Sequence, residues 1–102
     1  MRETGRNGYM TLVKERLKRE FPGCIILRND PHSNPTGTPD ITVLYGDRWA
    51  SLEIKGSEKA HHQPNQGFYV DKMDGMSYAA FIYPENEERV FSELQSALQP
   101  SR

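Results

Sequence analysis

Two short motifs hold the residues of this sequence whose types and spacing could do chemistry. Pro39-Asp40 is followed by Glu53-Ile54-Lys55. Glu53 and Lys55 are two positions apart, so on a β-strand their side chains point to the same face. Mg²⁺ prefers oxygen ligands and keeps several of its waters. We therefore expect Asp40, Glu53 and the backbone carbonyl of Ile54 to hold Mg²⁺, with Mn²⁺ as a substitute, beside the Lys55 ammonium.

This set of residues suits the hydrolysis of a phosphodiester bond. A divalent ion lowers the pKa of its water and neutralises the charge that builds on a phosphate. Lys55 can orient or help deprotonate that water, or offset the developing negative charge. Each motif alone has an ordinary explanation, because Asp40 can be a turn residue and Glu53 can form a solvated pair with Lys55. Their joint occurrence favours the functional interpretation.

The elements that must position these motifs follow the order α-β-β-β-α-β-α. Apolar residues recur at three- and four-residue intervals over 8–21, which predicts a helix that Pro22-Gly23 ends. A loop is expected over 30–39, a short helix over 66–74 and a last helix from Pro84. We expect strands over 24–29, 41–45, 49–55 and 78–83. In the helix over 66–74, the apolar residues expected on one side are Phe68, Tyr69 and Met73.

The expected strands at 41–45 and 49–55 are joined by a tight turn at 46–48. Antiparallel strands joined in this way place the start of the first strand beside the end of the second. Asp40 and Glu53 therefore converge. The whole chain, 1–102, is expected to form one α/β domain.

Length and composition set limits on the class of protein. The chain has 102 residues, of which 35% are hydrophobic and 26% charged, which predicts a thin core or one that a partner completes. No apolar run is long enough to cross a bilayer, and no signal peptide follows Met1. The single cysteine, Cys24, excludes an internal disulfide framework and fits the cytoplasm.

Charge is unevenly distributed along the sequence. Basic residues are in excess over 1–28, and acidic residues are in excess after Pro84. The basic stretch could contact nucleic-acid phosphates, or it could only solvate one face of the first helix. A zinc site is not expected, because the spacing of Cys24, His32, His61 and His62 matches no structural-zinc pattern.

The segment 37–56, GTPDITVLYGDRWASLEIKG, resembles the PD-(D/E)XK nuclease superfamily. The similarity is best to the virus-type replication-repair nucleases (VRR-NUC), with the archaeal-type Holliday-junction resolvases as relatives. The resemblance implies a restriction-endonuclease-like αβββαβ core, here followed by a C-terminal helix. It implies that Asp40 and Glu53 are metal ligands and that Lys55 is the catalytic lysine. It also implies a glutamine at the start of the next helix, where Gln66 has better spacing than Gln63.

One feature of the resembled family has no clear counterpart. Related nucleases carry an acidic residue on the first helix, facing the metal, and the matching position falls near Met10 or Thr11. Glu20 projects close to the apolar stripe and is the better substitute as a metal ligand, whereas Glu15 lies on the opposite face. Without such a ligand, the site is expected to bind metal more weakly or to use a single ion.

The resemblance implies a Mg²⁺-dependent endonuclease that selects DNA by structure and resolves Holliday junctions or other branched DNA. One thin domain buries too little surface for strong sequence recognition. A homodimer is expected, because a two-fold dimer presents two sites to the two strands of a branched substrate. Two alternatives stay open. One is a catalytically weak or inactive module that binds nucleic acid or partner proteins, and the other is a sequence-specific restriction-type enzyme.

Overall fold

The structure is a computed structural model that describes residues 5–99. Its element order, α-β-β-β-α-β-α, confirms the order expected from the sequence. The strands are β1 (Ile25–Arg28), β2 (Ile41–Tyr45), β3 (Arg48–Ile54) and β4 (Tyr78–Ile82). The helices are α1 (Gly5–Glu20), α2 (Pro64–Asp74) and α3 (Glu87–Leu98), with a 3₁₀ turn, η1 (Pro84–Asn86), before α3.

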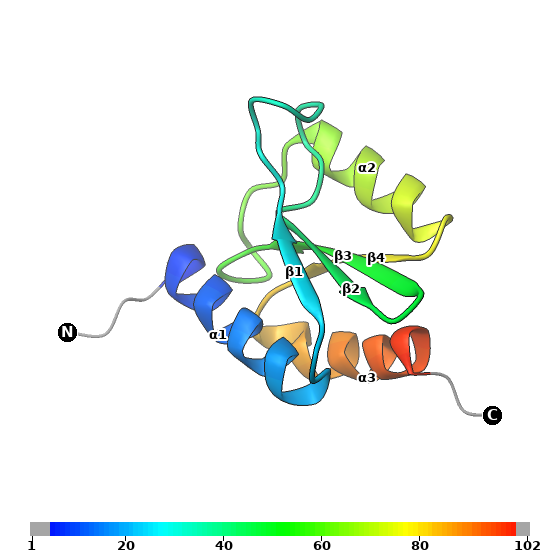
Figure 1. The fold of residues 1–102 in the computed structure, drawn as a ribbon. Coiled ribbons are helices and arrows are strands. Elements are labelled where there is room, and N and C mark those ends of the chain that lie inside the picture. Colours follow the sequence, from blue (N-terminus) through cyan, green and yellow to red (C-terminus); the bar gives the residue numbers. More distant parts are fainter. Residues whose placement is uncertain (1–4, 100–102) are drawn as a thin grey trace.

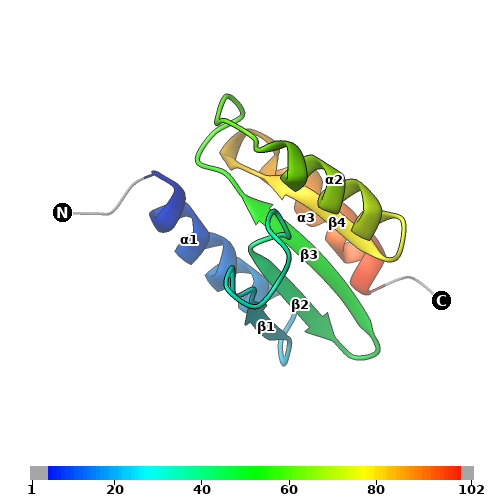
Figure 2. The same ribbon diagram turned by 90° about the horizontal axis from the view of Figure 1, so that it is seen from above.

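The four strands form one mixed sheet in the order β1-β2-β3-β4. β1, β2 and β3 are antiparallel neighbours, whereas β4 runs parallel to β3. A parallel neighbour requires a crossover connection, and α2 supplies it. Helices α1 and α3 lie on one face of the sheet and α2 lies on the other, so the fold has three layers (Figures 1 and 2). None of the helices within residues 5–99 is long and apolar enough to cross a membrane.

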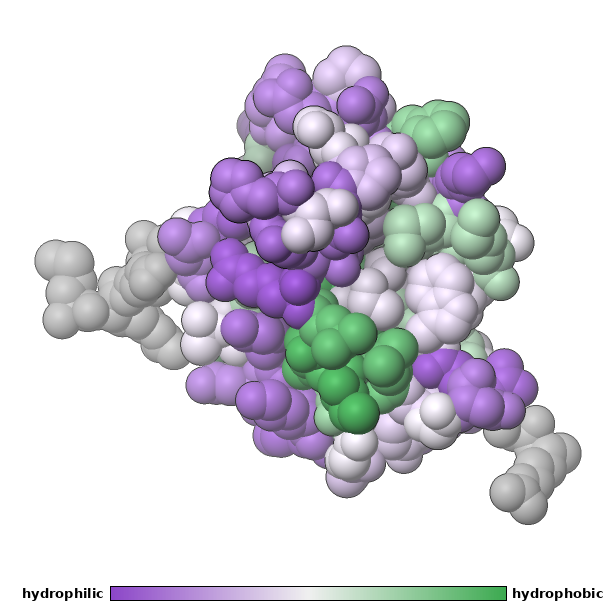
Figure 3. Space-filling model, turned by 45° about the horizontal axis from the view of Figure 1, so that its top comes forward, coloured by the Kyte–Doolittle hydropathy of each residue, from purple (hydrophilic) through white to green (hydrophobic). Residues whose placement is uncertain are grey.

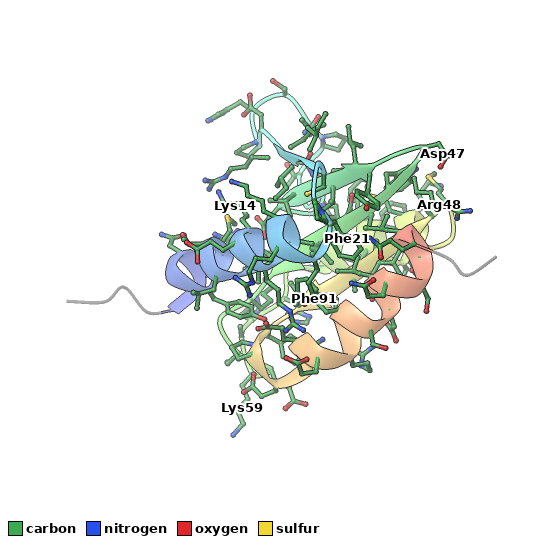
Figure 4. All side chains as sticks on the ribbon, turned by 60° about the horizontal axis from the view of Figure 1, so that its bottom comes forward. Lys14, Phe21, Asp47, Arg48, Lys59 and Phe91 are labelled. Atoms are coloured by element: carbon green, nitrogen blue, oxygen red, sulfur yellow. The ribbon has the colours of Figure 1, made fainter. Side chains whose placement is uncertain are left out.

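The hydrophobic core lies between the sheet and the helices α1 and α3. Phe21 and Phe91 point into this layer, where both side chains are buried (Figure 4). The apolar stripe expected on the first helix is buried as predicted. The core residues are Tyr9, Met10, Val13, Leu17, Phe21, Ile41, Val43, Ala50, Leu52, Ile54, Ile82, Val90, Phe91, Leu94 and Leu98.

Strand β3 is an inner strand that is buried on both faces. Ala50, Leu52 and Ile54 belong to the core on the α1–α3 side. The alternate positions Ser51 and Glu53, followed by Lys55, face the opposite layer and are also buried. This double burial explains why the sequence of the strand shows no clean alternation of apolar and polar residues.

The helices differ from their expected bounds at their starts. α1 begins at Gly5, three residues before the expected start at residue 8. α2 begins at Pro64, two residues before the expected start, because proline fits the first turn of a helix. Of the apolar residues expected on one side of α2, Phe68 is 58% exposed, and the buried residue of this helix is Val70.

Part of the sheet face around β1 is left uncovered. β1 is an edge strand, and α2 packs against β3 and β4. Ile25 and Leu27, two positions apart on β1, are 56% and 47% exposed. The space-filling view shows a compact apolar patch bordered by hydrophilic side chains (Figure 3). An exposed apolar area of this kind marks a surface that can associate with another molecule.

Candidate active site

The β2–β3 hairpin positions Asp40 beside the end of β3. Its two-residue turn, Gly46-Asp47, begins with a glycine at φ 64°, a conformation that suits a tight hairpin. The register pairs Ile41 with Leu52, so Asp40 lies opposite the last residues of β3. The Asp40 carboxylate accepts a hydrogen bond of 2.8 Å from the backbone N–H of Ile54. This bond holds the carboxylate at the end of the hairpin.

The Glu53 carboxylate is buried in the layer between the sheet and α2. Its Oε2 accepts a hydrogen bond of 2.9 Å from the side-chain amide of Gln66. Its Oε1 is buried without a hydrogen-bond partner among residues 5–99. Burial and the negative charge of Asp40 raise the pKa of Glu53 to about 8, although the positive charge of Lys55 opposes this shift. Burial is the largest cause of this shift, so a further positive charge beside Glu53 would stabilise its ionised form.

The Lys55 ammonium is held by two oxygen atoms. Its Nζ donates hydrogen bonds of 2.8 Å to Oε1 of Gln66 and 3.0 Å to the backbone carbonyl of His61. The same Nζ lies 3.8 Å from Oε2 of Glu53. An ammonium has three donors, so one N–H remains for a further acceptor.

Gln66 is the third residue of α2 and connects both charged residues. Its Oε1 accepts the hydrogen bond from Lys55 and a second one, of 3.0 Å, from the backbone N–H of Gln63, as in a capping box. With two donors directed at Oε1, the amide nitrogen faces Glu53. The structure brings Gln66 to Glu53 and Lys55. Gln63 is exposed, and its side chain makes no hydrogen bond to Glu53 or Lys55 among residues 5–99.

Arg6 is the functional candidate that sequence analysis missed. Its Nε donates a hydrogen bond of 3.2 Å to the carbonyl of Ile54, and its Nη2 pairs with the Asp40 carboxylate. The chain after β3 passes close to this turn of α1, since a Cβ at Gly56 would be in van der Waals contact with the backbone nitrogen of Arg6 at 3.4 Å. The basic excess over 1–28 was the only signal, since the first helix was expected to begin after Arg6.

Glu20, the expected first-helix ligand, is not brought to this site. Its carboxylate accepts hydrogen bonds of 2.6 Å from Arg16 and 3.1 Å from Gln95 of α3. Arg16 also pairs with Glu87 at 2.7 Å, so Glu20 belongs to the contact between α1 and α3. Arg6 and Glu20 are separated by about 21 Å along the helix, at 1.5 Å per residue. A residue at the C-terminal end of α1 therefore cannot replace one at its first turn.

The other first-helix positions also supply no acid to the site. Met10 is buried in the core, and Thr11 is exposed and hydrogen-bonded to the backbone carbonyl of Asn7. Glu15 is exposed. The residue of α1 that reaches Asp40 is thus a cation, Arg6, rather than a carboxylate.

The donor set fits a divalent cation that has few protein ligands. Within residues 5–99, no group of three or more His, Cys, Asp or Glu side chains is arranged to hold a metal. Two carboxylates and one carbonyl are nevertheless typical of Mg²⁺ sites, which use one or two carboxylates together with waters and substrate phosphates. The unpartnered oxygen of Glu53 and the guanidinium of Arg6 beside Asp40 both indicate a place that favours positive charge.

Comparisons of this chain with protein-family models, with curated proteins and with solved structures find no match.

Proposed function

We propose that the protein is a Mg²⁺-dependent nuclease of the PD-(D/E)XK type that hydrolyses phosphodiester bonds in DNA. The observation that carries the proposal is the hydrogen-bonded set of Glu53, Gln66 and Lys55 beside Asp40. The order of elements and the mixed four-stranded sheet also agree with an αβββαβ core followed by a C-terminal helix. Mn²⁺ is expected to replace Mg²⁺, since both are bound by oxygen ligands.

Each residue of the site has a distinct task in this proposal. Asp40, Glu53 and the carbonyl of Ile54 would hold the metal, which when bound lowers the pKa of a water and neutralises charge on the phosphate. The remaining N–H of Lys55 is available to a phosphate oxygen or to the attacking water. Gln66 acts as a positioning residue, because its amide holds Glu53 and Lys55 in fixed orientations.

Arg6 has to yield its place when the metal binds. Its guanidinium pairs with Asp40 and with the carbonyl of Ile54, two of the three proposed metal ligands. The Arg6 side chain is 42% exposed, so it can turn toward solvent or toward a phosphate. A guanidinium binds phosphate through two parallel N–H donors, which suits a role in holding the substrate.

The proposed substrate is branched DNA, and the proposed assembly is a homodimer of the VRR-NUC or junction-resolvase kind. The exposed pair Ile25 and Leu27 on the edge strand β1 supports an association of this kind. A two-fold interface uses the same patch on both subunits. Two active sites would then face the two strands of a junction.

A second candidate function is a catalytically inactive module of the same fold that binds nucleic acid or a partner protein. The observation that favours it is the contact of Arg6 with Asp40, because the first helix brings a cation to this carboxylate and not the expected acidic residue. In this case Arg6 would be a permanent structural replacement for the metal, and the site would bind no divalent ion.

Cleavage assays separate the two functions. The protein is incubated with branched, flapped and linear DNA and with Mg²⁺, Mn²⁺ or EDTA. Asp40→Ala and Lys55→Ala are compared with Asp47→Ala and Lys59→Ala, which change exposed residues of the same type. Metal-dependent cleavage lost only in the first pair supports the nuclease. DNA binding without cleavage under any metal supports the inactive module.

A further inference from the structure

A pocket of about 370 Å³ opens beside Asp40, between the first turn of α1 and the loop that joins β1 to β2. Its lining includes two arginines, Arg6 from α1 and Arg28 from the end of β1. Pro31 and Pro35 of the loop line it as well. The pocket thus combines positive charge and apolar ring surface next to a proposed metal ligand.

The loop wall of this pocket is held in place by specific contacts. Asn29 closes the base of the loop, since its side chain donates to the carbonyl of Pro39 and its backbone N–H donates to the carbonyl of Asp40 at 2.9 Å. At the far end of the loop, Gly37 packs against Asn65 of α2. Gly37 has φ 97°, and a Cβ on it would lie 2.5 Å from the Asn65 side chain, so this close approach requires glycine. The loop therefore bridges β1 and α2 as a formed wall.

The charge in the pocket is unbalanced. Arg28 makes no ion pair with any residue in 5–99. Asp30 is an acidic residue of the same loop. Its carboxylate accepts hydrogen bonds of 2.8 Å from the backbone N–H of His32 and 2.9 Å from the hydroxyl of Ser33. Asp40 is the acidic residue among those that line the pocket, and it is proposed to hold metal. Arg28 can therefore bind an anionic ligand in this pocket.

We infer that this pocket binds one nucleotide of the DNA strand, the unit next to the bond that is cut; this rests on the proposed function. Arg28 and Arg6 suit its phosphate, since guanidinium binds phosphate through paired donors. Pro31 and Pro35 offer apolar surface to its sugar and base. The volume lies at the lower end of the range for ligand pockets, about 300–1,000 Å³, which suits a single nucleotide and not a base pair.

A nucleotide site in this pocket limits which DNA structures the protein can cut. A nucleotide that enters the pocket has to leave the base stack, and that step costs least where the base is already unpaired. The pocket therefore selects DNA with an unpaired nucleotide beside the cut, as in a flap or at an open branch point. Fully paired linear DNA lacks such a nucleotide and is the poorer substrate.

Binding measurements without cleavage test the pocket. The full chain is titrated in EDTA against a labelled short oligothymidylate and against a labelled paired duplex, and fluorescence anisotropy gives the affinities. Arg28→Ala is expected to weaken single-strand binding by about tenfold, the loss of a charged hydrogen-bond pair. It is also expected to lower the salt slope by about one. Arg48→Ala, an exposed arginine at the distant β2–β3 turn (Figure 4), is the matched control and should leave both nearly unchanged.

A second pair of variants tests the cavity without changing charge. Thr36→Trp fills the pocket, whereas Asn34→Trp places the same bulk on an exposed loop position outside its lining. Only Thr36→Trp should weaken single-strand binding, and neither should change duplex binding. The inference would be overturned if Arg28→Ala and Arg48→Ala lost single-strand affinity equally. It would also be overturned if Thr36→Trp and Asn34→Trp bound the single strand equally well. Thermal unfolding checks that each variant is folded.

The nuclease activity and the nucleotide site can be refuted independently of each other. If oligothymidylate binding depends on Arg28 and Thr36 but no metal supports cleavage, the pocket stands as a nucleotide site and the nuclease activity is refuted. If cleavage occurs and the Arg28 and Thr36 variants bind and cut as the native chain does, the nuclease stands and the nucleotide site is refuted.

Discussion

The side-chain amide of Gln66 donates a hydrogen bond of 2.9 Å to the buried carboxylate of Glu53. Its oxygen is fixed at the same time by the Lys55 ammonium at 2.8 Å. The amide can satisfy both partners only in one orientation, because one end must accept and the other must donate. A carboxylate in its place would accept from Lys55 but would have no donor for Glu53.

Gln66→Glu is therefore expected to disturb the site although it keeps the shape of the side chain. The added negative charge faces Glu53, and cleavage is expected to fall about 10–100-fold, as for other residues that orient metal ligands. Single-turnover cleavage at saturating metal measures the effect. Gln63→Glu is the control on the same turn, since the Gln63 side chain is exposed. Similar rates for the two variants would remove Gln66 from the site.

Arg6→Ala is expected to increase the affinity for divalent metal. The guanidinium pairs with Asp40 and with the carbonyl of Ile54, so it competes with a metal for the same oxygens. Removing one competing charge near the surface is worth about 1 kcal/mol, which corresponds to an increase of about fivefold in affinity. Calorimetric titration with Mn²⁺ measures it directly.

The control for Arg6 is Arg19→Ala, a change of an exposed arginine on the same helix. It lowers the net charge equally but lies at the other end of α1. An equal gain in both variants would mean that only the overall charge matters. Absence of Mn²⁺ binding in every variant would instead favour the inactive module.

The metal-free protein is expected to lose stability as the pH rises. Burial and the charge of Asp40 raise the pKa of Glu53 from 4.5 to about 8. The folded state then binds more protons than the unfolded state between these values, so the free energy of unfolding falls by about 1 kcal/mol per pH unit across this window. Above about pH 8, Glu53 is ionised in both states and adds no further slope. Urea denaturation in EDTA at a series of pH values measures the change.

Glu53→Gln supplies the comparison for this pH dependence. It removes the titrating group while keeping the side-chain volume, so its stability should exceed that of the native chain at pH 8 and show a flatter profile. Mg²⁺ should restore stability to the native chain at pH 8 but not to this variant, because a ligand that binds only the folded state stabilises it. Parallel pH profiles of the two proteins would show that Glu53 titrates normally.

The solution mass tests the proposed homodimer. The native chain at micromolar concentration is expected to sediment at twice the mass of one chain. Leu27→Glu places a charge in the exposed apolar patch of β1 and should shift the population to monomer. Leu12→Glu changes another exposed leucine, on α1, and should not. A native chain that sediments only as monomer contradicts the dimer.

The local part of the site was predictable from the sequence. Asp40 and Glu53 are brought together by a hairpin whose register is set by the Gly46-Asp47 turn and by alternating burial of the strands. The spacing of Glu53 and Lys55 placed both on one side of β3 for the same reason. Short-range geometry decides these contacts, so a single sequence carries the information.

The remaining parts of the site depend on tertiary packing. The contact of Arg6 with Asp40 joins residues 34 positions apart, and it depends on where α1 crosses the sheet. Glu20 was chosen as a ligand from its face of the helix, but it lies about 21 Å along the helix from the turn that reaches Asp40, and which turn does so depends on this crossing. The start of α2 was also misplaced, because proline fits the first turn of a helix and α2 begins two residues earlier than expected, at Pro64.

Cleavage of a flapped DNA by three proteins shows whether Asp40 holds the metal on which hydrolysis depends. The native chain, Asp40→Asn and Asp47→Asn are compared in Mg²⁺ and in EDTA, with folding verified by thermal unfolding. We expect cleavage by the native chain and by Asp47→Asn in Mg²⁺ only. In Asp40→Asn we expect a loss of at least about a thousandfold, typical of losing a metal-holding group. Cleavage that persists in EDTA, or equal rates for Asp40→Asn and Asp47→Asn, would contradict this role of Asp40.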